Sequence, residues 1–240
     1  MPPQPRQPVH SQPDRATKIA VLCDFDDTIA QQNVAHMILE RFGDGSWKDV
    51  RRRYRDGQAT AEEYFEGPFV GLSATRDEIQ THVRVAGHLR SGFLDMANYC
   101  RDRDIPLAVV TAGFDFYVDA LLEQHGLGWI PTYTVGTRFT PKGMKFDFTH
   151  AREGCERWGI CKCSVVDLYR EQGRLIVYVG DGRNDLCPAR KADVVFARDV
   201  LKDLCLEESI PHIDFTGFAD VILEVDKLRV EATTRSTKKM

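Results

Sequence analysis

The chain has 240 residues, which at about 150 residues per domain predicts one core with a sizeable insertion. Its 32 basic and 36 acidic residues leave a net charge of −4, so no excess of positive charge is available for a nucleic acid or an anionic membrane. No apolar run approaches the roughly 18 residues of a membrane helix, and we expect neither a nucleic-acid nor a membrane partner.

The two ends of the chain look different from the rest. Residues 1–17 are rich in proline and lack the apolar segment of a secretory signal, which predicts a disordered leader and a cytoplasmic protein. Residues 230–240 are polar, and we expect a flexible tail there. The composition is compatible with a monomer or a homodimer.

Four apolar runs rich in β-branched residues are typical of strands buried on both faces of a parallel sheet. They are Lys18–Phe25, Leu107–Thr111, Leu175–Gly180 and Asp193–Ala197. Helical patterns follow at Phe114–Gln124 and Lys162–Gln172. Strands that alternate with helices predict an α/β fold with a doubly wound, Rossmann-like parallel sheet, built here from residues 18–32 and 88–229, whose ligands lie at the carboxyl ends of the strands.

Residues 33–87 lack such a strand and predict a small inserted helical cap domain. Apolar residues recur at helical spacing at Val34, Met37, Ile38 and Phe42, and Thr75 with Glu78 forms a candidate capping box. Further along, 130–148 alternates apolar and polar residues around Pro141-Lys142-Gly143, which predicts a β-hairpin.

Acidic residues follow two of the predicted strands directly. Asp24 and Asp26 end the first strand, and Asp181 and Asp185 follow the strand at Leu175–Gly180. Carboxylates this close repel one another unless a cation or a proton separates their charges. Hard oxygen ligands that converge from two strand ends are those that Mg²⁺ prefers, so the sequence predicts a magnesium site.

Two further motifs could bind an anion. Thr111, Ala112 and Gly113 end the second strand and offer a hydroxyl and small-residue amides that can approach an anion closely. Lys162 opens a predicted helix, where its ammonium would offset the charge of a bound phosphate. Lys142 and Lys145, in the predicted hairpin, are alternatives for that lysine.

In this order the four motifs resemble those of the haloacid dehalogenase (HAD) superfamily of phosphotransferases. The resemblance implies that Asp24 attacks phosphorus to form an aspartyl-phosphate and that Asp26 acts as general acid and then as base. It also implies Mg²⁺ held by Asp24, the Asp26 carbonyl, Asp181 and Asp185, with Thr111 and Lys162 on the phosphate. The expected activity is a Mg²⁺-dependent phosphomonoesterase acting on a small metabolite.

Asp26 and the helical insertion at 33–87 indicate which subclass of the superfamily the chain resembles. Asp26 favours phosphate over halide substrates, and the helical insertion is similar to the cap of the phosphoserine-phosphatase-like subclass. Asn33 stands where phosphoserine phosphatase carries a substrate-binding Glu. Residues 109–118 and 193–199 resemble the methionine-salvage 2-hydroxy-3-keto-5-methylthiopentenyl-1-phosphate phosphatase family, whereas 182–188 looks like the phosphoethanolamine/phosphocholine phosphatases. Phosphotransfer to another acceptor, or a catalytically idle binding module on this scaffold, are the alternative functions.

The predicted cap supplies candidate specificity residues. Asn33, His36, Phe42 and Trp47 would line the mouth of the site, although Phe42 also fits a cap core and His36 a hydrogen-bonded structural role. A basic run at Arg51, Arg52, Arg53 and Arg55 would meet a second anionic group on the substrate or form a solvated helix face.

The seven cysteines are an odd number, which predicts reduced thiols rather than a disulfide framework. Three of them cluster in the sequence with a histidine. His150, Cys155, Cys161 and Cys163 form a possible ligand set for a structural Zn²⁺, since three thiols and an imidazole suit a tetrahedral site. The alternative is a group of reduced thiols beside a loop.

Overall fold

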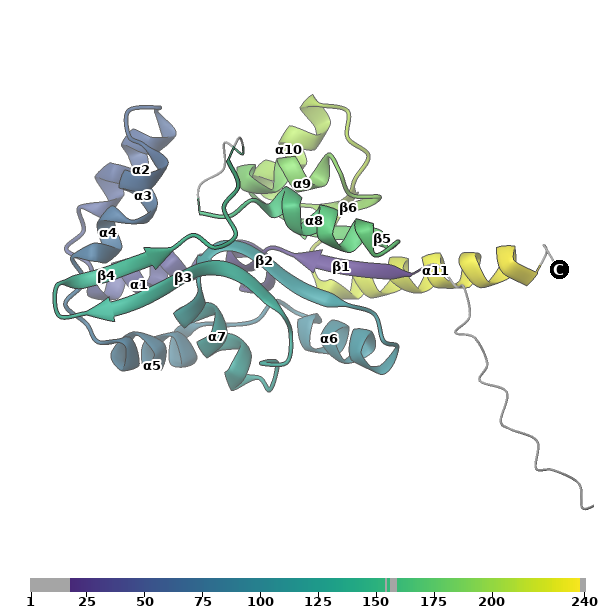
Figure 1. The fold of residues 1–240 in the computed structure, drawn as a ribbon, viewed down its shortest axis with the longest axis horizontal. Helices are drawn as coiled ribbons and strands as arrows, with labels where there is room; N and C mark the ends of the chain where they lie inside the picture. Colours follow the sequence, from purple (N-terminus) through teal and green to yellow (C-terminus); the bar gives the residue numbers. More distant parts are fainter. Residues whose placement is uncertain (1–17, 154, 156–158, 238–240) are drawn as a thin grey trace, which may run out of the picture.

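The computed structural model describes residues 18–153, 155 and 159–237. A seven-stranded sheet in the order β4-β3-β2-β1-β5-β6-β7 forms its centre (Figure 1). The strands are β1 (Ile19–Cys23), β2 (Leu107–Phe114), β3 (Thr132–Thr140), β4 (Gly143–Asp147), β5 (Leu175–Gly180), β6 (Val194–Ala197) and β7 (Ile213–Asp214). All neighbours pair in parallel except β3 and β4, so the predicted α/β sheet is confirmed.

The predicted strands lie close to the observed ones. β5 has the predicted bounds, while β2 continues beyond Thr111 to Phe114, and its pairing with β3 becomes irregular after Val110. The hairpin is confirmed by the antiparallel β3–β4 pair, in which Thr140 faces Gly143. Because β3 also pairs with β2, the hairpin extends the main sheet rather than standing apart.

Helices cover both faces of the sheet, as Figure 1 shows. Along β1, Val21 and Cys23 join the core shared with α6 (Phe93–Asp102), α7 (Asp115–Gln124) and α11 (Phe218–Thr237). The alternate residues Ala20 and Leu22 pack with α8 (Lys162–Glu171) on the other face. All five residues of β1 are buried, which explains its unbroken apolar sequence.

Two short helices complete the second face beside β6. These are α9 (Leu186–Ala189) and α10 (Asp199–Glu207), whose apolar residues form a small cluster with Val195 and Ala197. At the other end of the chain, α11 continues to Thr237. This helix extends into 230–240, where the sequence predicts a flexible tail. The predicted leader, 1–17, lies outside the described residues.

The segment 33–87 forms helices that stand at the β3–β4 end of the sheet (Figure 1). They are α1 (Val34–Phe42), α2 (Trp47–Arg55), α3 (Ala61–Phe65), α4 (Gly67–Val70) and α5 (Arg76–Ala86). An antiparallel bridge between Ala30 and Leu89 ties the outgoing and returning chain together. The predicted capping box of Thr75 and Glu78 is confirmed at the start of α5.

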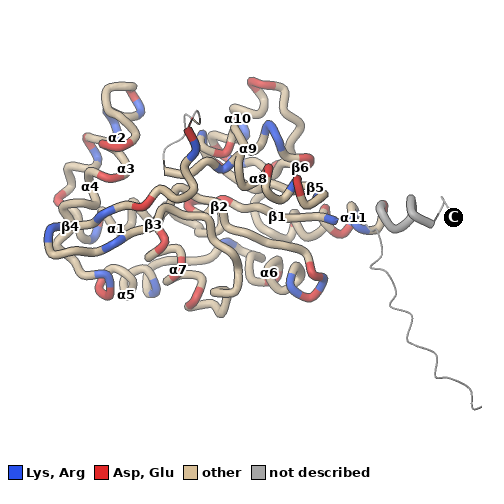
Figure 2. The backbone as a smooth tube through the Cα atoms, viewed as in Figure 1, with Lys and Arg blue, Asp and Glu red and all other residues tan. Residues whose placement is uncertain are grey.

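Charged residues of both signs alternate along the outer helices and loops, while the central strands carry few (Figure 2). Neither sign dominates along the described part of the backbone in this view, in line with the small net charge. Among the described residues, no helix combines the length and the apolar character needed to cross a membrane.

Candidate active site

The site begins where β1 ends. Asp24 is buried, and its backbone N–H donates to the carbonyl of Val179 on β5 at 2.9 Å, which continues the parallel pairing of β1 with β5. The chain then winds into a short π-helical turn, η1 (Phe25–Ile29), in which Asp27 has a φ of +59°. Aspartate tolerates this left-handed conformation better than most residues, so a tight acidic turn is compatible with the sequence.

Three of the predicted carboxylates meet at this point. One carboxylate oxygen from each of Asp24, Asp181 and Asp185 lies within 4.8 Å of the other two. Thr28 Oγ1 donates to Asp181 Oδ1 at 2.8 Å, and Tyr178 Oη donates to Asp185 Oδ1 at 2.6 Å. The structure thus brings together side chains from two strand ends that are far apart in the sequence.

Lys162 connects this acidic cluster. Its Nζ donates to Asp24 Oδ1 and to Asp185 Oδ1, the latter at 2.6 Å, from a side chain that is only 4% exposed. Burial lowers the lysine pKa, but Asp185 and Asp24 outweigh burial and raise it above its usual value. Lys142 and Lys145 lie exposed on the hairpin and do not line the site, so the structure favours Lys162 among the three lysines.

The cluster carries more negative charge than Lys162 neutralises. The pKa of Asp24 is raised to about 7. Burial is the largest cause, the charge of Asp185 adds to it, and Lys162 acts in the opposite direction. The pKa of Asp181 rises to about 9 through burial and the charges of Asp24 and Asp185. Three close oxygen donors with uncompensated charge are a donor set that suits a hard divalent cation such as Mg²⁺.

Asp26 points away from this cluster toward the cap. Its Oδ1 accepts from the backbone N–H of Val34 at 2.6 Å, and its Oδ2 accepts from Tyr117 Oη at 2.7 Å. Burial raises the Asp26 pKa to about 6, while both hydrogen bonds lower it. A carboxyl with this pKa exchanges a proton readily near neutral pH.

The end of β2 forms the wall beside Asp26. Thr111 is buried, and its Oγ1 accepts from the N–H of Gly113 at 3.0 Å. A Cβ atom on Gly113 would lie 2.4 Å from Tyr117 Oη and 3.1 Å from Asp26 Oδ2. Gly113 is therefore needed for the close approach of Tyr117 to Asp26.

A cavity of about 600 Å³ lies over these groups. Its floor contains the acidic cluster, Lys162 and the predicted anion-binding residues Thr111, Ala112 and Gly113. The cap and the end of β2 contribute apolar and aromatic residues to its wall, among them Leu39, Tyr54, Tyr64, Phe65, Phe69 and Phe114. A volume of this size accommodates a small metabolite.

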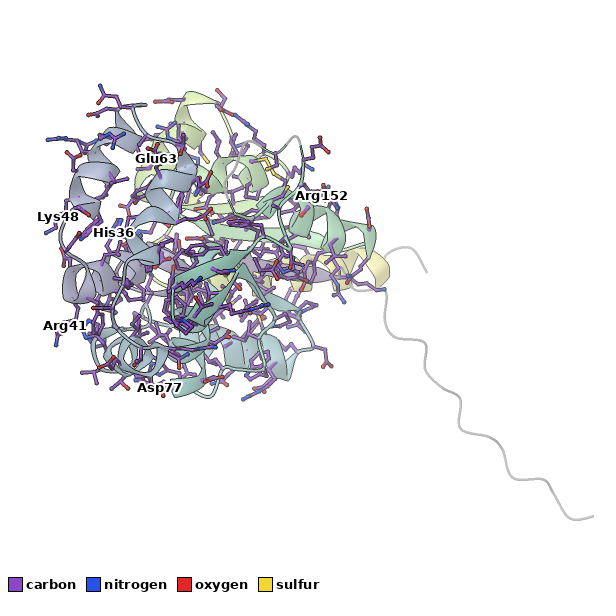
Figure 3. The ribbon with its side chains drawn as sticks, turned by 60° about the vertical axis from the view of Figure 1, so that its left-hand side comes forward. His36, Arg41, Lys48, Glu63, Asp77 and Arg152 are labelled. Carbon is purple, nitrogen blue, oxygen red and sulfur yellow. A yellow bond between two sulfur atoms is a disulfide. The ribbon has the colours of Figure 1, made fainter. Side chains whose placement is uncertain are left out.

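Two of the predicted cap residues line this cavity. Asn33 caps α1 by accepting from the N–H of His36 at 2.9 Å. His36 Nε2 lies 2.8 Å from Tyr64 Oη, and burial and the nearby Arg51 lower the His36 pKa to about 4. In Figure 3, Arg41 and Lys48 extend outward from the cap while His36 lies further in.

Phe42 does not line this cavity and fits the alternative interpretation, a place in the packed interior. Phe42 packs edge-on against His82, with ring centroids 5.5 Å apart, because it lies on the face of α1 turned to the cap core. Trp47 is also absent from the cavity wall and stacks beneath His36 at 4.9 Å.

The basic run divides between two faces of α2. Arg51 and Arg55 line the cavity, whereas Arg52 donates to Asp49 and Arg53 lies 3.7 Å from Glu63. Arg51 and Arg55 are four residues apart and therefore share one face of α2, whereas Arg52 and Arg53 lie on other faces.

Several functional hydroxyls were missed by the sequence reasoning. Tyr117, Tyr178 and Thr28 bind Asp26, Asp185 and Asp181, respectively. Thr28 belongs to the acidic motif and was within reach of a sequence argument. Tyr117 and Tyr178 occupy ordinary apolar positions of a helix and a strand, and no local pattern marks them.

The cysteines also depart from the prediction. Cys163 and Cys187 form a disulfide, whose Cα atoms are 6.0 Å apart, so the expectation of reduced thiols throughout is wrong. The fold brings the start of α8 beside α9, which the sequence spacing did not reveal. Sulfurs of Cys155, Cys161 and Cys163 lie within 4.8 Å of one another, but the His150 ring is not part of this group and packs against Tyr133.

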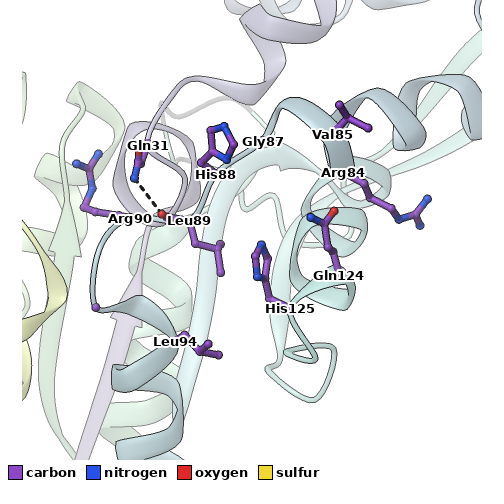
Figure 4. A pocket seen from close by; sticks show the side chains of 11 residues that line it. Gln31, Arg84, Val85, Gly87, His88, Leu89, Arg90, Leu94, Gln124 and His125 are labelled. Carbon is purple, nitrogen blue, oxygen red and sulfur yellow. Dashed lines mark hydrogen bonds between the residues drawn. The ribbon is translucent and has the colours of Figure 1, made fainter.

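A second cavity of about 440 Å³ lies where the chain passes between cap and core (Figure 4). Residues of 84–94, Gln31, Gln124 and His125 line it, and Gln31 Nε2 donates to the Leu89 carbonyl at 3.1 Å across its wall. None of the described residues lining it is a carboxylate or a cysteine, and its polar side chains are those of Gln31, Gln124, His88, His125 and two arginines.

Comparisons with known proteins agree with this geometry. The haloacid dehalogenase-like hydrolase model matches residues 21–190. A 2-hydroxy-3-keto-5-methylthiopentenyl-1-phosphate phosphatase of Geobacillus kaustophilus is 32% identical, over 89% of this chain and 98% of its own length. The enzyme of the same name from Geobacillus thermodenitrificans is 31% identical, over 90% and 99%. Among solved structures, a phospho-aspartyl intermediate analogue of phosphoserine phosphatase superposes with a TM-score of 0.66 at 18% identity, covering 87% of this chain and 99% of that one.

Proposed function

The chain belongs to the haloacid dehalogenase-like hydrolase family and is a phosphomonoesterase, and we propose that it hydrolyses a small phosphorylated metabolite through an aspartyl-phosphate on Asp24. The observation that carries this proposal is the meeting of Asp24, Lys162, Asp181 and Asp185 in the cavity between the cap and the ends of the strands. A catalytically idle module would gain nothing from carboxylates held this close.

In the proposed first step, a carboxylate oxygen of Asp24 attacks phosphorus, a new O–P bond forms and the ester P–O bond breaks. Asp26 donates its proton to the leaving oxygen. In the second step, water attacks the phosphorus of the acyl phosphate, Asp26 takes the proton from that water, and the Asp24 carboxylate is released with phosphate. A pKa of about 6 suits Asp26 for both transfers.

Positive charge and hydrogen-bond donors would hold the phosphoryl group. Lys162 already lies between Asp24 and Asp185, and the Thr111 hydroxyl and the Ala112 amide belong to residues that line the same cavity. Asp24, Asp181, Asp185 and the carbonyl of Asp26 would hold Mg²⁺, which when bound offsets the negative charge on the phosphoryl oxygens.

For the substrate we propose 2-hydroxy-3-keto-5-methylthiopentenyl-1-phosphate, the compound in the names of the relatives. The name describes a phosphate at one end, oxygens in the middle and an apolar methylthio group at the other end. The cavity offers groups suited to each of these parts, with Lys162 and Thr111 for the phosphate, Arg51 and His36 for the oxygens, and the aromatic rings of Tyr54 and Phe65 for the methylthio group. Sulfur groups pack favourably against such aromatic rings.

The cavity offers little to a cationic substrate. Among the described residues that line it, every carboxylate belongs to the two acidic motifs, residues 24–27 and 181–185, and none comes from the cap helices. Asn33, whose amide is engaged at the start of α1, supplies no charge for an ammonium. Arg51 and Arg55 would repel the amine of phosphoserine, phosphoethanolamine or phosphocholine.

The test is phosphate release from a panel of esters with Mg²⁺, using wild type and Asp24→Asn. We expect the methylthio substrate to give the highest kcat/KM and the variant to lose about a thousandfold or more. Preference for phosphoserine, phosphoethanolamine or phosphocholine would overturn the substrate proposal while leaving the chemistry intact. Faster product formation with added alcohols, without matching free phosphate, would identify a phosphotransferase instead.

A pair of arginines on α2 tests the cavity wall. Arg51→Met removes a charge from the cavity, whereas Arg52→Met removes one that pairs with Asp49 outside it. We expect KM to rise about tenfold or more in the first variant and to stay near wild type in the second, since a hydrogen bond to a charged group is worth about 1.5–3 kcal/mol. An Arg51→Met variant whose KM stays near that of wild type would contradict a contact between Arg51 and the substrate.

A further inference from the structure

Four cysteines gather on the face of the core that carries α8 and α9, outside the catalytic cavity. We propose that Cys155, Cys161, Cys163 and Cys187 together form a structural Zn²⁺ site in the reduced protein. This site differs from the predicted set, in which His150 was the fourth ligand. The proposal is independent of the substrate.

Three of the sulfurs are close to the required geometry. In a tetrahedral zinc–thiolate site with Zn–S bonds of about 2.3 Å, sulfurs lie about 3.8 Å apart. Those of Cys155, Cys161 and Cys163 lie within 4.8 Å of one another. Cys161 and Cys163 are 5% and 6% exposed, so two of these ligands are shielded from water.

Cys187 lies outside this group of three mutually close sulfurs, and we infer that it supplies the fourth sulfur because it is bonded to Cys163. Two-electron reduction of that bond by a dithiol gives two thiols, whose Cα atoms, 6.0 Å apart, remain close enough for both sulfurs to bind one ion. Zn²⁺ then replaces the protons of four thiols, and four protons pass to solvent. The disulfide and the zinc site are thus two alternative states of the same cluster.

The His150 ring does not compete for this place. It packs against Tyr133 with ring centroids 5.3 Å apart, and only its backbone takes part in the loop, where the carbonyl accepts from the N–H of Cys161 at 2.8 Å. The negative thiolates also gain from their position, because Cys161 and Cys163 lie at the N-terminal end of the ten-residue helix α8.

The proposed ion would hold two parts of the catalytic site together. Lys162 lies between two ligands, Cys161 and Cys163, and Asp185 comes two residues before the ligand Cys187. The salt bridge between Lys162 and Asp185 joins the same two segments. Zinc would therefore position catalytic side chains from behind the cavity without contacting substrate.

The direct test is metal analysis of the full chain reduced with dithiothreitol under argon, then desalted after incubation with Zn²⁺. We expect about one tightly held zinc per chain. Replacement by Co²⁺ should produce strong near-ultraviolet thiolate-to-cobalt absorption, which a carboxylate site for Mg²⁺ cannot give. A reduced wild-type chain that shows neither zinc nor this absorption overturns the proposal.

Single variants identify the ligands. Cys161→Ser and Cys187→Ser should each lose at least tenfold in zinc affinity, whereas Cys205→Ser on α10 and His150→Ala should keep it. Circular dichroism checks that each variant folds, and the cobalt spectrum of wild type needs no variant at all. Full zinc binding by Cys187→Ser, or loss of zinc in His150→Ala, would overturn the assigned ligand set.

Discussion

At the scale of single residues, the candidate site depends on where side chains are missing as much as on where they are present. Gly180 lies at the end of β5, and a Cβ atom there would come within 2.6 Å of the Asp185 carboxylate carbon. A Cβ atom on Gly182 would lie 3.7 Å from Asp185 Oδ2, an ordinary contact. The two glycines of the acidic motif are therefore not equivalent.

This difference gives a matched pair of variants. Gly180→Ala should displace Asp185 and lower kcat/KM about a hundredfold, because misplacement by about 1 Å costs that much in a preorganised site. Gly182→Ala should cause a much smaller loss. Steady-state kinetics with Mg²⁺ measures both, and similar losses in the two variants would contradict the steric argument.

Tyr117 controls the proton on Asp26. Its hydroxyl donates to Asp26 Oδ2 and lowers the pKa of that carboxyl, so Tyr117→Phe should raise the Asp26 pKa. A hydrogen bond to a charged group is worth about 1.5–3 kcal/mol, which corresponds to a shift of roughly one to two pH units. The acidic limb of the kcat profile should move to higher pH by that amount.

The control for this prediction is Tyr99→Phe, which removes a hydroxyl that donates to Asp226 at 2.7 Å, remote from the cavity. Its pH profile should match that of wild type. An unchanged profile in Tyr117→Phe would mean that Asp26 does not set the acidic limb.

At the scale of elements, the ends of helices and strands decide what the site contains. β2 continues past Thr111 to Phe114, so Ala112 and Gly113 lie in extended backbone beside the cavity rather than in a loop. α8 begins at Lys162, which brings its ammonium to the acidic cluster. In the cap domain, the start of α5 is fixed by N-cap hydrogen bonds, and the contribution of these bonds to stability can be tested separately.

Thr75, the N-cap of α5, makes both hydrogen bonds of a capping box. Its side chain accepts from the Glu78 N–H, and the Glu78 side chain accepts from the Thr75 N–H. Thr75→Ala should lower the free energy of unfolding by about 1 kcal/mol. Ser46, at the start of α2, makes no such cap hydrogen bond, and Ser46→Ala should cost less. Urea denaturation of both variants measures the difference, and a larger loss for Ser46→Ala would contradict the assignment of these caps.

At the scale of the whole molecule, the acidic cluster couples stability to pH and metal. The folded-state pKa values of Asp24 and Asp181 are raised to about 7 and 9, above their ordinary value of 3.8. Without a cation, the folded state is therefore most stable at low pH. Its free energy of unfolding falls as pH rises through those values, because the unfolded chain releases these protons first. A bound cation offsets this loss of stability at high pH, because the cation binds the carboxylates in their charged form.

Mg²⁺ should therefore raise Tm more at pH 8 than at pH 5.5. At a hundred times Kd the expected gain is about 2.7 kcal/mol, or roughly 5–10 °C for a chain of this size. Differential scanning fluorimetry with and without Mg²⁺ measures it, with Asp181→Asn as the variant expected to lose the gain. A Mg²⁺ effect that is equal at both pH values would exclude these carboxylates as its source.

The sequence by itself determined the sheet and the order of the acidic motifs. A strand such as Ile19–Cys23, buried on both faces, must be apolar throughout, and the carboxylates at strand ends stand out from such runs. The hairpin and the capping box at Thr75 were likewise predictable, because alternation and capping are patterns among residues near one another in the chain.

Only the tertiary structure decided which distant groups meet. Tyr117 reaches Asp26 across 91 positions of sequence, and Thr28 reaches Asp181 across 153. The pairing of Cys163 with Cys187 depends in the same way on the packing of α8 against α9. Periodicity fixes the face on which a residue lies, but the partner on that face is set by how complete elements pack.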